Sequence, residues 1–229
     1  MKYTHKIIFY LISIPILVFT FIGPFLPLII SHRSDWWEAR IFVFLCVLSF
    51  ILGRSFAAPG LPSERIRFMT HENAKAWDKI FVPLIMICIG LVPLVAGIDS
   101  LYNWSPIFGL QIKILSLLVM IAGSTLTTYA IIENRYFSSV VRIQHDRGHQ
   151  VISSGPYRWI RHPGYTGIIL TYITVPFFLD SIWSIIPALF LTIILVIRTT
   201  LEDKTLQDEL KGYREYAKRV QYRLFPGLW

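Results

Sequence analysis

Long apolar runs alternate with short polar stretches along the whole chain. The runs cover residues 7–30, 41–52, 80–98, 107–132, 165–179 and 182–197. Because a helix needs roughly 20 residues to cross a bilayer, three runs are long enough alone, the second needs its flanks, and the last two are short. The pattern predicts an all-α, polytopic integral membrane protein with about six transmembrane helices. The last two are expected to form a tight helical hairpin that turns at Asp180 and Ser181.

The composition agrees with a membrane protein. Of the 229 residues, 54% are hydrophobic and only 16% are charged, which is too apolar for an ordinary soluble domain of this length. The first run follows Lys2 and Lys6 as a signal peptide would, but it is too long for an ordinary signal peptide and lacks a small-residue cleavage site. We therefore expect this run to remain as a membrane anchor.

The positive charges are distributed unevenly between the two sides of the predicted bundle. Of the 22 Lys and Arg residues, 19 lie before the first run, in residues 54–79 and 135–161, or from residue 198 onward. The remaining three are Arg33, Arg40 and Lys113. The positive-inside rule then predicts cytoplasmic termini and cytoplasmic charged loops. Because these cations are interspersed with membrane segments, the formal net charge of +8 does not indicate a nucleic-acid partner.

The chain is interpreted as one membrane domain with two parts. Residues 1–132 supply the N-terminal helices, and their cytoplasmic connector, residues 54–79, is expected to be a solvated loop with a short interfacial helix. Residues 133–229 supply a loop, the hairpin and a C-terminal helix over residues 201–222, whose helical pattern predicts a lid on the loop. The apolar positions of that helix are Leu201, Leu206, Leu210, Tyr213, Tyr216 and Val220. Pro226 and Trp229 are expected to anchor the end of the chain at the membrane interface.

The loop before the hairpin is the most informative stretch of the sequence. Between Gly148 and Gly167 it holds four glycines and two prolines, which permit tight turns and a close approach of the backbone to a ligand. Its rings and cations include His149, Tyr157, Arg161, His162 and Tyr165. Aromatic faces suit a sulfonium or another soft cation, and arginine suits a carboxylate or a phosphate. A rigid connector decorated with interfacial side chains is the alternative interpretation.

Arg198 and Glu202 are four residues apart at the end of the last apolar run, so both project from one helix face. An ordinary surface ion pair would contribute little to stability. Because ionisable groups near the membrane are costly, the two residues are also candidates for a functional site. Cys46 and Cys88 lie inside apolar runs without metal-ligand spacing, so neither a disulfide nor a metal site is expected.

Two segments together resemble a known family. The pattern His149-x5-Gly155-Pro-Tyr157-x3-Arg161-His162-Pro163-x-Tyr165-x-Gly167, followed by Arg198-x3-Glu202, resembles the isoprenylcysteine carboxyl methyltransferase family. It is similar, more loosely, to phospholipid N-methyltransferases. The resemblance covers the chain from about residue 131 to its end. The N-terminal helices carry no motif of the family.

The resemblance implies a cofactor, S-adenosyl-L-methionine, bound at the cytoplasmic face between the loop and the C-terminal segment. The residues implied to line the cofactor pocket are His149, Val151, Gly155, Tyr157, His162, Pro163, Tyr165 and Glu202. Arg198, Glu202 and Arg161 are implied to be catalytic: Arg198 would hold the substrate carboxylate, and Arg161 would support the loop or the cofactor. Asp203 departs from the related pattern, which often has a second glutamate at this position.

The first functional hypothesis is carboxyl O-methylation of an isoprenylcysteine-like or other lipidic carboxylate that enters from the bilayer. N-methylation of a phospholipid amine is the alternative within the same class, and it would need Glu202, Asp203 or a histidine as a base. An NADPH-dependent sterol-type membrane reductase is the alternative from another class. A transporter is poorly supported, because the apolar runs contain almost no charges apart from Lys113.

Overall fold

The computed structural model describes residues 18–58 and 74–229. Over these residues it contains helices and no strand, so the all-α prediction is confirmed. The α-helices are α2 (Leu26–Ser31), α3 (Trp37–Ser55), α5 (Asp78–Tyr102), α6 (Leu110–Glu133), α7 (Pro163–Phe178), α8 (Ile185–Glu209) and α9 (Tyr213–Arg219). Short 3₁₀ turns are η1 (Gly23–Phe25), η3 (His145–Arg147) and η4 (Gly155–Arg158). The predicted interfacial helix and the start of the first apolar run fall outside the described residues.

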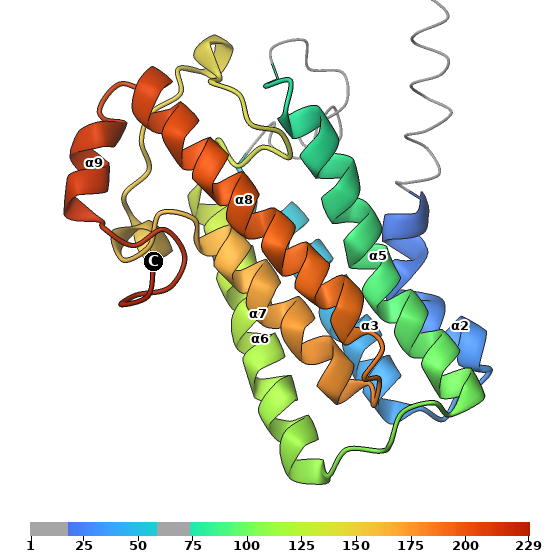
Figure 1. Cartoon of the computed structure of the whole chain (residues 1–229). Coiled ribbons are helices and arrows are strands. Elements are labelled where there is room, and N and C mark those ends of the chain that lie inside the picture. Colours follow the sequence, from blue (N-terminus) through green and yellow to red (C-terminus); the bar gives the residue numbers. More distant parts are fainter. Residues whose placement is uncertain (1–17, 59–73) are drawn as a thin grey trace, which may run out of the picture.

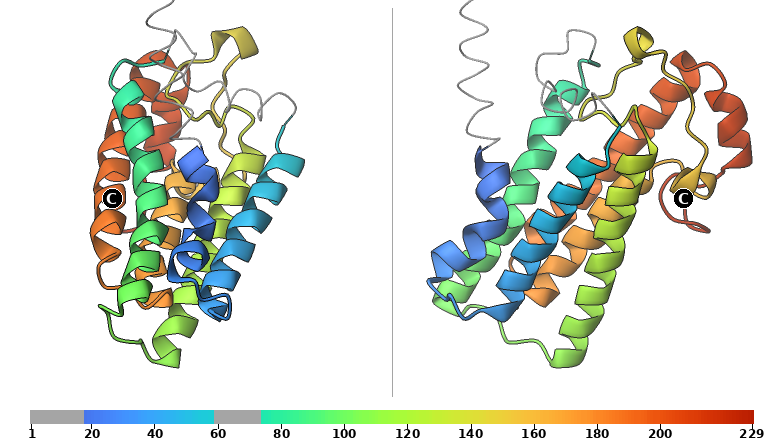
Figure 2. Two further views of the ribbon diagram at one scale, coloured as in Figure 1. Left: turned by 90° about the vertical axis from the view of Figure 1, so that its right-hand side faces the viewer. Right: turned by 180° about the vertical axis from the view of Figure 1, so that it is seen from behind.

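The long helices lie side by side in one bundle, and the loop of residues 134–162 and α9 gather at one end of it (Figures 1 and 2). We call this the pocket end. Among the described helices, α5, α6 and α8 are long and apolar enough to cross a membrane. The protein is therefore an integral membrane protein by the length and composition of its helices. The full count of six spans and their orientation stay predictions.

The first helix of the predicted hairpin, α7, is short as expected, with 16 residues, but the second helix is not. Asp180 has a positive φ of 54°, and the amide of Ser181 donates to the carbonyl of Pro176 at 2.8 Å, so the predicted turn position is confirmed. However, α8 is not short: it continues for 25 residues to Glu209. The charged residues after the apolar run extend the helix instead of starting a new one.

The predicted helix over residues 201–222 is wrong as a single element. Its first part is the end of α8, and its second part is the separate helix α9. The break lies at Gly212, whose φ of 84° is a conformation that glycine adopts without steric cost. The predicted lid is confirmed, because α9 buries its apolar face against the loop. The buried cluster consists of Ile143, Leu210, Tyr213, Tyr216 and Val220, with Leu206 and Val151 partly buried beside it.

Helices α6 and α7 make the most extensive helix-to-helix contact of the bundle. Glycines allow the backbones of these two helices to come close together. A Cβ atom at Gly167 would lie 2.2 Å from Thr127 Oγ1, and one at Gly123 would lie 2.7 Å from the carbonyl oxygen of Gly167. Small residues at such contacts let helix backbones come close in membrane proteins. The start of α7 is thereby fixed against the end of α6, and these two ends carry the loop that forms the pocket.

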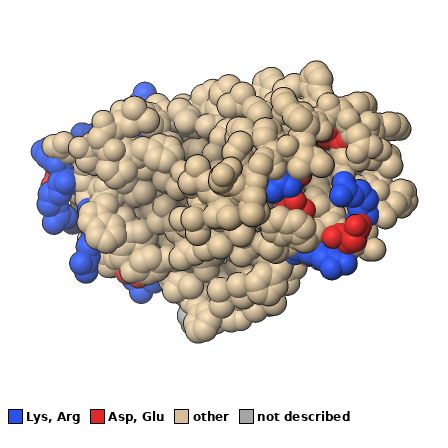
Figure 3. All heavy atoms as spheres, turned by 90° about the horizontal axis from the view of Figure 1, so that it is seen from below, with Lys and Arg blue, Asp and Glu red and all other residues tan. Residues whose placement is uncertain are grey.

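The end of the bundle opposite the pocket contains a buried charge network. The Lys113 ammonium on α6 pairs with Glu38 on α3 and lies 2.6 Å from Asp180 Oδ2 in the hairpin turn. Asp99 on α5 accepts hydrogen bonds from the hydroxyls of Ser105 and Ser181 at 2.6 and 2.7 Å. Seen from this end, the surface is mostly uncharged, and its charged groups are few (Figure 3).

Candidate active site

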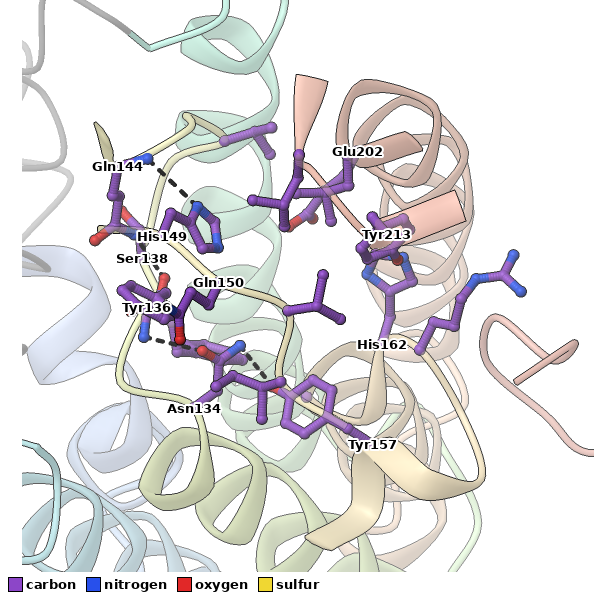
Figure 4. Close-up of a pocket in the computed structure, with 18 of the residues that line it drawn as sticks. Asn134, Tyr136, Ser138, Gln144, His149, Gln150, Tyr157, His162, Glu202 and Tyr213 are labelled. Carbon is purple, nitrogen blue, oxygen red and sulfur yellow. Dashed lines mark hydrogen bonds between the residues drawn. The ribbon is translucent and has the colours of Figure 1, made fainter. Parts of the chain in front are cut away.

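A pocket lies at the pocket end, between the loop, the ends of α7 and α8, and α9. The space between its walls measures about 760 Å³ when the part open to solvent is included. Its lining residues are Asn134, Tyr136, Phe137, Ser138, Val140, Val141, Arg142, Gln144, His149, Gln150, Val151, Ile152, Tyr157, Arg161, His162, Gly164, Tyr165, Glu202, Leu206, Leu210, Tyr213 and Tyr216. Figure 4 shows Glu202, Tyr213 and His162 across the pocket from Gln144, His149 and Tyr136.

Most residues implied by the family resemblance lie in this lining. They are His149, Val151, Tyr157, Arg161, His162, Tyr165 and Glu202. The structure thus brings together side chains from the loop, α7 and α8 that are up to about fifty residues apart in the sequence. Gly155, Pro163 and Arg198 are not among the lining residues. Gly155 and Pro163 act on the backbone of the loop, and Arg198 lies behind the pocket wall, as described below.

Gly155 and Pro163 shape the loop that carries the lining residues. Gly155 begins η4 with a φ of 54°, and a Cβ there would lie 2.9 Å from the Glu133 side chain. Only glycine fits such a position without strain. Pro163 is the first residue of α7, where a missing N–H leaves no hydrogen bond unmade. These two residues set the direction of the backbone on either side of Tyr157.

Glu202 and Tyr165 form the polar centre of one wall. The Tyr165 hydroxyl donates to Glu202 Oε2 at 2.6 Å. The Tyr165 ring stacks on the His162 ring, with 5.8 Å between centroids and an interplanar angle of 5°. Because Glu202 is only half-buried and lines the pocket, its carboxylate offers acceptor oxygens to a cation or a hydroxyl group in the cavity.

His149 and Tyr136 form the opposite wall. Their ring centroids are 4.6 Å apart, and His149 Nδ1 accepts the amide N–H of Gln144 at 3.3 Å. Burial, followed by the positive charge of Arg142 and its neighbours, lowers the pKa of His149 to about 4. The imidazole is therefore neutral at neutral pH. With Nδ1 accepting, the ring proton is assigned to Nε2.

Asp203 is the hub that joins the loop to the C-terminal segment. It is fully buried and accepts from Arg161 Nε at 2.7 Å and Nη2 at 2.9 Å. Tyr213 Oη and Arg223 Nε also donate to it, at 3.0 and 3.1 Å. Arg161 in turn donates through Nη1 to the carbonyl of Val220 at 2.7 Å. Asp203 is thus a buried structural residue that does not itself line the pocket.

Arg161 is bound to the C-terminal segment through both its side chain and its backbone. Its side chain is bound to Asp203, and its backbone amide donates to the carbonyl of Tyr222 at 3.0 Å. The next amide, of His162, donates to the carbonyl of Arg223 at 2.9 Å. These backbone bonds tie the loop to the segment that follows α9.

Arg198 is buried behind the pocket wall and is paired with Asp78. Its Nε and Nη2 atoms donate to the two Asp78 carboxylate oxygens at 2.7 and 3.0 Å. Its guanidinium carbon lies 5.2 Å from the Tyr165 ring centroid. Arg198 and Glu202 therefore contact the same tyrosine, one at its ring and the other at its hydroxyl. They do not form the ordinary surface ion pair that was the alternative interpretation.

Several pocket residues were not predicted from the sequence. Asn134 Nδ2 donates to the Tyr157 hydroxyl at 3.3 Å. Gln144, which is 1% exposed, donates through Nε2 to the carbonyl of Tyr136 at 2.7 Å. Polar residues directly after the apolar run of α6 were the available signal for Asn134 and Tyr136. No pattern in the sequence distinguishes Gln144 from a residue of a solvated loop.

The fold and site define a class: a helical integral membrane protein with a polar, aromatic-lined pocket at one end of its bundle. Residues 115–208 match the model of the isoprenylcysteine carboxyl methyltransferase (ICMT) family. The match confirms the resemblance that the loop and α8 motifs indicated, and it supports a methyltransferase. The matched segment contains most of the pocket lining but neither Asp78 nor α9.

The relatives agree with this family match at modest identity. The chain is 29% identical over 152 residues to a "Probable protein-S-isoprenylcysteine O-methyltransferase" of Oryza sativa subsp. indica, with 62% of each chain covered. It is 33% identical over 82 residues to the Delta(14)-sterol reductase TM7SF2 of Mus musculus, covering 34% of this chain and 20% of the reductase. The chain thus spans less than two thirds of the length of these relatives.

Proposed function

We propose that this protein is an S-adenosylmethionine-dependent membrane methyltransferase that esterifies an isoprenylcysteine-like or other lipidic carboxylate. The observation that carries the proposal is the pocket itself. Its walls come mainly from the ICMT-matching segment, and they bring the Tyr165–Glu202 pair opposite the neutral His149. The proposed orientation places this pocket and both termini on the cytoplasmic side, as the distribution of Lys and Arg predicts.

The residues present fit the proposed cofactor. A sulfonium carries a positive charge, which aromatic rings and a carboxylate favour; Tyr157, Tyr165 and Glu202 supply these groups. The cations near the pocket do not oppose it, because Arg161 is paired with Asp203 and the pKa of His149 is lowered to about 4. Side-chain amides in the lining offer hydrogen bonds to the polar groups of the cofactor.

The cofactor, when bound, supplies a methyl group on sulfur, so that a carbon–oxygen bond forms at the acceptor as the carbon–sulfur bond breaks. An acceptor carboxylate is already ionised and needs no general base. The protein's task is then to orient the two partners and exclude water. Glu202 and Tyr165 are proposed to fix the cofactor side of the pocket, and the buried ring of Tyr157 to keep it dry.

The acceptor is proposed to enter from the bilayer and to be held through Arg198. Asp78 already occupies the Nε and Nη2 atoms of this guanidinium, so the carboxylate of the acceptor would be received at Nη1. An aromatic ring of the pocket, that of Tyr165, lies against the same guanidinium. The proposal requires the acceptor carboxylate to reach the pocket beside Tyr165, because methyl transfer needs the acceptor oxygen in line with the carbon–sulfur bond.

N-methylation of a phospholipid amine would require a base in the pocket. His149 is a poor candidate, because a pKa of about 4 makes it a weak base. Glu202 is the remaining carboxylate of the lining that could accept the proton. An NADPH-dependent reductase is the candidate of another class, and the similarity to the mouse sterol reductase is the observation in its favour.

The test uses the purified protein in lipid nanodiscs with methyl-labelled S-adenosylmethionine, a prenylcysteine analogue and phosphatidylethanolamine. Ester formation predicts label that mild base releases as methanol, and base-stable lipid label would indicate N-methylation. Retention of NADPH with no label transfer would indicate a reductase. Glu202→Gln is expected to weaken cofactor binding about tenfold, since it removes a charged acceptor from the pocket. Glu215→Gln, on the exposed face of α9, is the matched control.

A further inference from the structure

Asp78 is the first residue of α5 and lies outside the segment that matches the family. The sequence predicted only a solvated connector at this position, yet its side chain is fully buried. Its carboxylate accepts from Arg198 at 2.7 and 3.0 Å and from the backbone amide of Val141 at 2.6 Å. One carboxylate therefore joins α5, α8 and the segment that follows α6.

The segment held by Asp78 is a wall of the pocket. Ser138, Val140 and Val141 line the cavity. Arg198 Nη2 reinforces the attachment by donating to the carbonyl of Ser139 at 2.9 Å. The amide of Lys75 donates to the carbonyl of Val141 at 3.0 Å, so both polar backbone atoms of Val141 are bound from the side of α5.

A second route leads from Asp78 to the opposite wall. Asp78 fixes Arg198, and the Arg198 guanidinium lies 5.2 Å from the Tyr165 ring centroid. Tyr165 donates its hydroxyl to Glu202. Displacing Arg198 would therefore disturb the ring that carries the polar centre of the pocket, although Asp78 itself does not touch the cavity.

We propose that Asp78 is a positioning residue of the methyl-transfer site, acting through Arg198 and through the wall of residues 138–141. Its effect on turnover rests on the proposed function. A buried guanidinium that loses the carboxylate with which it is paired keeps a poorly compensated charge. An asparagine at position 78 would have the same shape and keep one acceptor oxygen, but its amide nitrogen would face a group that can only donate. The wall and the guanidinium could then no longer both be held as they are by the carboxylate.

The experiment compares Asp78→Asn with the control Asp208→Asn, which alters an exposed carboxylate on α8. In nanodiscs, amide exchange over residues 138–141 should quicken about tenfold or more in Asp78→Asn, because the Val141 amide and Arg198 would compete for the one acceptor oxygen that remains. With methyl-labelled S-adenosylmethionine and a prenylcysteine analogue, kcat/KM should fall about tenfold or more. Neither quantity should change in Asp208→Asn.

Unchanged exchange over residues 138–141, or faster exchange with unchanged kcat/KM, would overturn the proposal. A wild-type protein that binds the cofactor but forms no ester would contradict the proposed function alone. In that case the dissociation constant of S-adenosylmethionine replaces kcat/KM in the same comparison. If Asp78→Asn does not fold, Asp78→Glu takes its place, since it keeps the charge and displaces the carboxylate by one methylene.

Discussion

The two ends of the bundle both bury charges but use them differently. At the end opposite the pocket, Lys113 contacts two carboxylates directly, and the hairpin turn closes over the network. At the pocket end, Asp203 and Arg161 are equally well paired, but Glu202 beside them faces an open cavity. Buried ion pairs thus hold the helices at both ends, and at the pocket end the Glu202 carboxylate also faces a cavity.

The difference follows from the length of the connections. The turn between α7 and α8 is short, so the side chains of Asp180 and Ser181 in the turn are bound by Lys113 and Asp99 of neighbouring helices. The connection between α6 and α7 is long, and it is held open by α9 and by its bonds to residues 222 and 223. A long loop anchored at several points encloses space that a tight turn cannot enclose.

Replacing Asp203 should have the largest effect on cofactor binding and on stability. Asp203→Ala leaves Arg161 without its carboxylate and removes the acceptor of Tyr213. The free energy of unfolding should therefore fall by about 3–5 kcal/mol. The expected result is loss of S-adenosylmethionine binding together with a lower thermal midpoint in nanodiscs. Asp208→Ala, an exposed carboxylate on the same helix, is the control. Retained cofactor affinity in Asp203→Ala would contradict the role of the hub.

Lys113→Met should change the end opposite the pocket without changing the pocket end. It leaves Glu38 and Asp180 without their cation at the end opposite the pocket, and should destabilise the protein by about 3 kcal/mol or more. Because the pocket lies at the other end, the dissociation constant of S-adenosylmethionine should stay the same in the folded protein. The thermal midpoint and the binding isotherm are the two measurements. A parallel loss of cofactor affinity would show that the ends are coupled.

The smallest expected effect is the pH dependence contributed by His149. Its pKa is lowered from 6.5 to about 4, so the unfolded chain binds more protons between these values. Stability from this group is therefore complete above about pH 6.5 and declines as the pH falls toward 4. His149→Gln should flatten the fall in thermal midpoint between pH 7 and pH 4.5. Equal slopes in the variant and the wild type would assign that dependence to other groups.

The sequence predicted the fold class, because neighbouring residues alone determine whether a run is apolar and long enough to cross a membrane. It also predicted most of the loop side of the site, since His149, Tyr157, His162 and Tyr165 lie within one short motif. The sequence did not predict the buried ion pairs of Asp78 and Asp203, whose partners are 120 and 42 positions away in the chain. A charged residue near a membrane boundary looks the same in the sequence whether it is solvated or buried.

By itself, then, the sequence determined the apolar helices, the turn at Asp180 and the family motif, all of which are encoded by neighbouring residues. The tertiary structure decided which carboxylate meets which arginine, where α8 ends and α9 folds back, and which motif residues reach the cavity. Burial and ion pairing depend on distances between helices, and these distances arise from side-chain packing across the whole bundle, as at the glycine contacts between α6 and α7.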